Sequence, residues 1–196
     1  MGDKMIISDD NRKGILSLAR LTTRASLSGG SLPVMHTHQG IFAEKKGLVV
    51  SLYFEDQLCA EMENIFAEDP LGQSLVEMID LTISMVRESM EILPDDLDKL
   101  RVAISIVDEV FPSPELSEFS TGSHGVIVQA SDDVGALLPE LAEQLSLSPE
   151  QFLGMCCTEE LGLAADIWKS DDAEYFFFTT EEFICLPAGG CGGCGS

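Results

Sequence analysis

The sequence has few basic residues. Lysine and arginine together number 11 among 196 residues, against 34 aspartates and glutamates, so the formal net charge is −23. Binding to a nucleic-acid backbone requires clustered Lys and Arg, and no basic stripe is visible in this sequence. Long-range repulsion also opposes association with DNA, RNA or an anionic membrane surface. We therefore expect no nucleic-acid partner and no membrane partner.

Long apolar runs are also missing. No run approaches the roughly 20 residues that a membrane helix requires. The N-terminus, MGDKMIISDDNRK, has acidic residues where a secretory signal carries positive charge followed by an apolar stretch. Both absences predict a cytoplasmic protein. In a reducing compartment its cysteines are expected to be free, metal-bound or redox-active, and not joined in structural disulfides.

Familiar catalytic motifs are absent as well. The sequence contains no Ser-His-Asp constellation, no phosphate-binding P-loop and no dinucleotide fingerprint. No enzyme class therefore follows from a local motif.

The remaining pattern predicts a folded α+β chain. Ser8 is a plausible N-cap for a first helix that ends at Gly29-Gly30, and Ser148, with Gln151 three residues later, forms a capping-box pattern. Few tight hairpin signals are present. The expected helices cover residues 11–27, 70–92 and 148–157, and the expected strands cover 47–54, 101–107, 125–129 and 175–183.

The order of segments in the second half of the chain is characteristic. The strand GVIVQ is followed by ALLPELAEQL, SPEQFLGMCC, LGLAADIW and YFFFTTEEF. This order resembles the AMMECR domain family, whose bacterial members are called system protein A of the AmmeMemoRadiSam gene set. The opening GILSLARLTTRASLSGG and the strand GLVVSLYF are similar to the family's first helix and to its GVFVTL strand. The resemblance implies mixed or antiparallel sheets with helices, in two small lobes around a cleft, over residues 8–184.

The chain departs from the family pattern at three places. The family's hallmark LRGCIG aligns with Leu58-Cys59-Ala60-Glu61-Met62-Glu63, so Glu61 takes the place of the family Cys and Cys59 that of the Arg. RESMEILP replaces the DPRF-type turn after the long helix. TEELGL stands where the family has KAGL, with one extra residue that blurs the alignment. Each change removes a basic group or a cleft loop. If the family cleft handles an anionic ligand, we expect this chain to have lost that role.

Residues 185–196 form a Gly/Cys-rich tail outside the resemblance. Cys185, Cys191 and Cys194 provide three thiols, and glycine lets CGGC curl until both of its sulfurs reach one ion. Three thiolates make an incomplete zinc site, or hold an iron–sulfur cluster with one open iron. A tail of this composition is also typical of substrates of peptide-modifying radical S-adenosylmethionine (SAM) enzymes, a class present in the family's gene set. A third interpretation is an exposed tail without a role.

Two further groups have simpler explanations. His36 and His38 use a spacing that metals accept, but no acidic or Cys ligand lies beside them, which favours a surface loop. Cys156 and Cys157 point about 100° apart on a helix and are expected to pack in the core.

Our first functional hypothesis is therefore a divergent, non-enzymatic AMMECR-domain accessory or scaffold protein. Its tail would bind metal or be matured by a radical SAM partner, and a MEMO-like protein is the other partner that the gene set implies. The alternative is an enzyme that uses the cleft between the lobes, with Cys59, Glu61 and Glu63 as the local candidates for chemistry.

Overall fold

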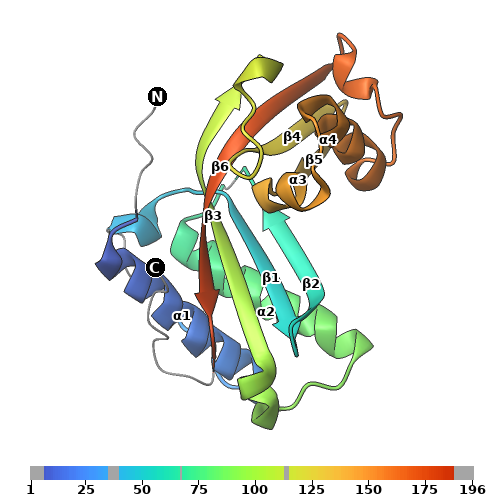
Figure 1. The fold of residues 1–196 in the computed structure, drawn as a ribbon. Coiled ribbons are helices and arrows are strands. Elements are labelled where there is room, and N and C mark those ends of the chain that lie inside the picture. The colour runs from blue at the N-terminus through green and yellow to red at the C-terminus, as the bar shows by residue number, and fades with distance from the viewer. Residues whose placement is uncertain (1–6, 35–39, 67, 113–114, 188–196) are drawn as a thin grey trace. The chain divides into compact units, whose positions relative to one another are not determined.

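A computed structural model describes residues 7–34, 40–66, 68–112 and 115–187. The chain divides into two compact units, residues 1–106 with 181–196 (unit 1) and residues 107–180 (unit 2). The sheet order is β2-β1-β3-β6-β4-β5, and the two 13-residue strands, β3 (Leu100–Pro112) and β6 (Ala173–Cys185), each belong partly to both units (Figure 1). The predicted α+β class is confirmed.

Unit 1 combines two long helices with antiparallel strands. Helix α1 (Asp9–Ser28) begins at Ser8, whose side chain accepts the Asn11 N–H, and ends at Gly29 with φ 67°. Both caps were predicted, because a hydroxyl satisfies a free N–H at a helix start and glycine adopts positive φ without strain. Helix α2 (Leu71–Ser89) starts where Pro70 predicts and ends three residues earlier than expected, because Met90 is extended.

Strands β1 (Leu48–Phe54), β2 (Gln57–Asn64) and β3 form the sheet of unit 1, with β1 antiparallel to both neighbours. Alternate residues such as Val50, Leu52 and Ile104 pack with α1 and α2 in one buried cluster, and β6 adds Phe183 and Cys185 to it. Burial of this apolar surface is the main stabilising term for the unit.

Unit 2 surrounds a second buried cluster that is rich in aromatic rings. Strands β4 (Gly125–Ala130) and β5 (Asp133–Leu137) form a hairpin, and β4 also pairs with β6. Helices α3 (Pro139–Leu145) and α4 (Pro149–Met155) contribute Ala142, Phe152 and Leu153 to this cluster, and Phe177 comes from β6. Cys156 and Cys157 are fully buried in it, so the expectation of core packing is confirmed.

Two hairpins were not predicted. The turn between β1 and β2 uses Glu55 and Asp56, with φ of 48° and 64°, and the turn between β4 and β5 starts with Ser131 at φ 58°. Sequence signals for such turns rely on Asn-Gly or Asp-Gly pairs, and neither turn has one. The predicted path from GVIVQ directly to ALLPELAEQL was therefore wrong, because β5 lies between them. Strand β3 also extends past Val107 into a segment expected to be a loop.

The capping box of α4 offers a direct test of local stability. The Gln151 N–H donates to Ser148 Oγ at 3.3 Å, and the Ser148 N–H donates to Gln151 Oε1 at 2.9 Å. We expect Ser148→Ala to lower the free energy of unfolding by about 1 kcal/mol, because one helix N–H loses its acceptor. Urea titration followed by circular dichroism measures this change. Ser84→Ala, in the exposed interior of α2, is the matched control and should be neutral or slightly stabilising. Equal effects of the two substitutions on the free energy of unfolding would contradict a stabilising role of the Ser148 cap.

Candidate functional site

The segment that aligns with the family hallmark forms β2, the edge strand of unit 1. Its register with β1 pairs Leu52 with Ala60 and Tyr53 with Leu58, so Cys59 is the extra residue of a β-bulge. The Cys59 thiol donates to the Gln57 carbonyl at 3.3 Å. Cys59 packs, with Ala60 and Met62, against the cluster that contains the helices.

Glu61 and Glu63 are exposed and follow the bulge at alternate positions of β2. They therefore share the face opposite Ala60 and Met62. The register places Ser51 beside Glu61, and Ser51 Oγ donates to Glu61 Oε2 at 2.5 Å. Because Cys59 packs with the core and both carboxylates do not, the structure separates the thiol from the two acids. The three catalytic candidates do not form one constellation.

Small and polar side chains continue across this carboxylate face. Ser51 pairs with Ala103 of β3, and Val49 lies between Glu63 of β2 and Ser105 of β3. Ser51 and Ser105 are buried, whereas the glutamates at the edge of the sheet are exposed. The exposed edge of this face can therefore offer carboxylates to a cation or to a proton-transfer step. Neither β1 nor β2 contains a Lys or Arg that could take the place of the family Arg.

The predicted metal ligand Cys185 lies in the core of unit 1. It is 1% exposed at the end of β6, and its Sγ lies 3.7 Å from the Leu16 carbonyl oxygen, to which the thiol donates. Burial raises the pKa of the Cys185 thiol to about 11, although Arg20 and Arg24 oppose the rise. A thiolate is the form that binds metal. Ligation by Cys185 would therefore require the end of β6 to leave the core.

A row of residues on α1 holds the chain that leads to the tail. Arg12 Nη2 lies 2.7 Å from Glu181 Oε1, and its guanidinium lies 5.0 Å from the ring centroid of Phe183. Further along the helix, Arg24 Nε donates to the Pro187 carbonyl at 2.9 Å. Positions 12, 16, 20 and 24 lie at successive i, i+4 spacing and therefore on one side of the helix. This side of α1 therefore holds the chain as far as Pro187.

Several predicted site residues lie outside the described part of the chain. These are Cys191, Cys194, His36 and His38. Within the described ranges, no group of three or more His, Cys, Asp or Glu side chains is arranged to hold a metal ion. In the same ranges, no helix has the length and apolarity needed to cross a bilayer.

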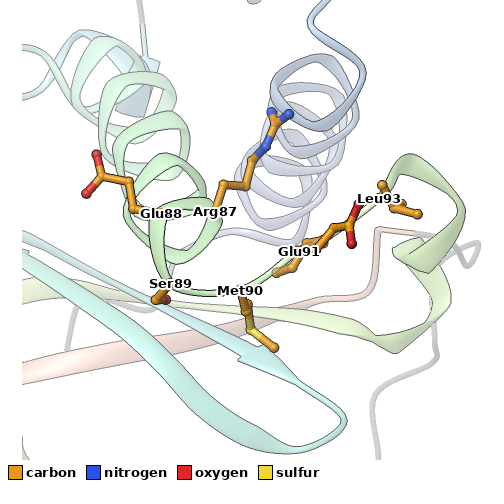
Figure 2. Close-up of a pocket in the computed structure, with 7 residues that line it drawn as sticks. Arg87, Glu88, Ser89, Met90, Glu91 and Leu93 are labelled. Atoms are coloured by element: carbon orange, nitrogen blue, oxygen red, sulfur yellow. The ribbon is translucent and has the colours of Figure 1, made fainter.

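A pocket of about 440 Å³ was not anticipated from the sequence. It is lined by Arg87–Leu93, the segment after α2 in which RESMEILP replaces the family turn. Figure 2 shows Arg87 extending from the last turn of α2 toward the space between α1 and α2. Its Nη1 donates to the Ser26 carbonyl at 3.3 Å. A cation at helix C-termini is favourable, so Arg87 stabilises the C-terminal ends of both helices.

The third departure coincides with an unusual helix end. Residues Cys156–Glu160 continue α4 as a π-helical turn, whose wider i→i+5 repeat accommodates an additional residue. Gly135 of β5 makes room for this turn, since a Cβ there would lie 2.6 Å from the Glu160 Cβ. The segment TEELGL, where the sequence comparison predicts an extra residue, thus begins within this π-helical turn.

Comparison with known proteins identifies the family of the chain. The family model described as AMMECR1 matches residues 16–183. The chain belongs to the AMMECR1 family. Protein Mbar_A1807 of Methanosarcina barkeri is 28% identical over 175 residues, which cover 83% of this chain and 85% of that protein. Protein TV1384 of Thermoplasma volcanium is 30% identical over 163 residues and 78% of each chain.

A solved structure supports the same fold. The crystal structure of the uncharacterized protein PH0010 from Pyrococcus horikoshii matches with a TM-score of 0.77, covering 91% of this chain and 93% of that one. The sequence identity is 21%, so the match concerns the AMMECR1 fold and not its activity.

Proposed function

We propose that this AMMECR1-family protein is a non-catalytic accessory or scaffold protein of an AmmeMemoRadiSam-type system, and that its chemistry resides in the Gly/Cys tail. The observation that carries the proposal is the separation at the hallmark segment. Cys59 packs against the core of unit 1, whereas Glu61 and Glu63 lie on the opposite face of β2. A nucleophile and its acid or base must be within hydrogen-bond reach, so this segment lacks a catalytic arrangement.

The chain that leads toward the tail is held on α1. Arg24 donates to the Pro187 carbonyl, and Cys185 is buried beside Leu16, so contacts with α1 hold the chain as far as Pro187. On this proposal Cys191 and Cys194 bind metal or an iron–sulfur cluster, or are modified by a radical SAM partner. Cys185 joins them as a third ligand only if β6 frays. A MEMO-like protein remains the other proposed partner.

Anaerobic native mass spectrometry of the full-length protein, isolated from its own host, tests this proposal. We expect additional mass on the wild-type chain that is lost in a Cys191→Ser/Cys194→Ser variant and retained in Glu61→Ala. Mass that leaves on denaturation indicates metal or a cluster, and mass that persists on the tail peptide indicates covalent modification. A bare wild-type chain, or additional mass that survives replacement of both cysteines, contradicts the proposal. Retention of the additional mass in a Cys185→Ser variant indicates a two-thiol site, and its loss indicates a three-thiol site.

A second candidate function is supported by the 2.5 Å hydrogen bond between Ser51 and Glu61. It is an enzyme that uses the carboxylate face of β1 and β2, with Glu61 and Glu63 in acid–base roles and Cys59 beside them only if the bulge rearranges. On this hypothesis Glu61→Ala abolishes cellular function while deletion of residues 186–196 leaves it intact. The tail proposal predicts the reverse: deletion of residues 186–196 abolishes cellular function, and Glu61→Ala leaves it intact. Complementation of a strain that lacks the gene measures both variants.

A further inference from the structure

His124 lies at the end of the loop that precedes β4, and its ring is an integral part of that loop. The Ser120 backbone N–H donates to His124 Nδ1 at 3.1 Å. The loop closes on itself further, because the His124 N–H donates to the Ser120 carbonyl at 2.9 Å. Nδ1 therefore accepts a hydrogen bond, which only the unprotonated nitrogen of a neutral imidazole can do.

Aromatic rings surround the imidazole. Phe177 of β6 stacks on it with centroids 5.8 Å apart and an interplanar angle of 19°, and Phe111 of β3 lies at 5.5 Å. Phe119, from the same loop, meets it edge-on at 6.1 Å. Burial in these surroundings lowers the pKa of His124 below its ordinary value of 6.5, against a smaller opposing effect of the Glu118 backbone and carboxylate.

The loop also covers the core of unit 2. Phe119 makes T-shaped contacts with Phe152 and Phe177, at centroid distances of 5.9 and 5.1 Å. Phe152 is fully buried and Phe177 is 1% exposed. Any opening that moves Phe119 would therefore bring water to these two rings, at a cost set by their apolar area.

We propose that His124 is a pH-sensitive latch that holds residues 115–124 closed over the aromatic core of unit 2. Protonation of Nδ1 places a second N–H opposite the Ser120 N–H, so the hydrogen bond becomes a repulsion between donors. It also places a positive charge in a partly desolvated position. The loop then opens, and Phe119 leaves Phe152 and Phe177.

The charged neighbours define the direction of the response. Glu118 is the carboxylate that acts on the ring, and it accepts the Glu115 N–H at 2.9 Å within the same loop. The rings facing His124 from β3 and β6 are those of Phe111 and Phe177, and β4 carries no charged residue. The latch is thus fully closed above pH 6.5, and its contribution is lost as the pH falls through the lowered pKa.

Hydrogen–deuterium exchange of the full-length protein at pH 7.5 and pH 5.0 tests the latch, with rates corrected for intrinsic chemistry. We expect protection of peptides within 115–124 to fall at pH 5.0, by at most about 30-fold because the open loop binds a proton with the ordinary pKa of 6.5, while α1 and α2 stay protected. His124→Asn keeps an acceptor near the Nδ1 position and should remain closed at both pH values. His124→Phe keeps the stacking ring without an acceptor and should be open at both.

Three outcomes would overturn the proposal. One is equal protection of the wild-type loop at the two pH values. Another is a pH response that persists in His124→Asn, and the third is loss of protection throughout unit 2, which would mean global unfolding. The two other histidines, His36 and His38, are replaced by alanine in a background variant, so that a response from them is recognised. If either His124 variant fails to fold, nitrogen-15 shifts of the wild-type ring report whether the closed form holds Nδ1 unprotonated.

Discussion

Replacing Phe152 with alanine is expected to lower the free energy of unfolding by about 3–5 kcal/mol. Phe152 has no exposed surface, and its ring belongs to the aromatic cluster with Phe119 and Phe177. Truncation removes the transfer free energy of the ring and leaves a cavity that rigid neighbours fill only partly. Urea denaturation monitored by fluorescence of Trp168, in the same cluster, measures the change.

Leu145→Ala is the matched control for Phe152→Ala. Leu145 is the last residue of α3 and is 50% exposed, so its truncation should change stability by no more than about 0.5 kcal/mol. A loss below about 1.5 kcal/mol for Phe152→Ala would show that unit 2 is not packed around this ring. A normal loss together with a changed denaturant slope would instead indicate that the two-state description fails.

Cys185 is expected to resist alkylation in the native protein. A pKa of about 11 in place of the ordinary 9.0 reduces the thiolate fraction at pH 8 by roughly 100-fold, and burial also blocks the reagent. The Cys185 peptide should therefore react with iodoacetamide at least about 100-fold more slowly in buffer than in 8 M urea. Mass spectrometry of quenched time points gives both rates.

Cys59 provides the internal control for this experiment. It is partly exposed in the bulge of β2, so native protein should label there while Cys185 stays unmodified. Rapid native labelling of Cys185 would show that the end of β6 opens readily. That result would return Cys185 to the set of ligands available with Cys191 and Cys194, because a thiol that reaches a reagent also reaches an ion.

The long helices and the strands β1 and β4 could be predicted from the sequence because their signals are local. Ser8 and Gly29 act within one turn of the helix they bound, and the apolar face of α2 repeats at helical spacing. The two hairpin turns could not be predicted, since Glu55, Asp56 and Ser131 adopt positive φ where glycine is the usual residue. There the pairing of the strands overrides the preference of the turn residues.

The candidate site was harder to predict than the fold, because its properties come from contacts between distant segments. Nothing beside Cys185 in the sequence indicates that Leu16 and the α1 arginines surround its thiol. Similarly, a regular strand would place Cys59, Glu61 and Glu63 on one face, and only the register with β1 reveals the bulge that separates them. No local sequence signal marks His124, since its ring partners lie up to 53 positions away in β6.

The bulge at Cys59 also bears on how copies of this protein meet. An edge strand with free N–H and C=O groups is a template for pairing with another chain, and bulges and charges are the usual ways to prevent it. Strand β2 has both, because Cys59 interrupts the register while Glu61 and Glu63 would face the same charges on an approaching second copy. The bulge and the two carboxylates thus oppose pairing of β2 with the same strand of a second copy.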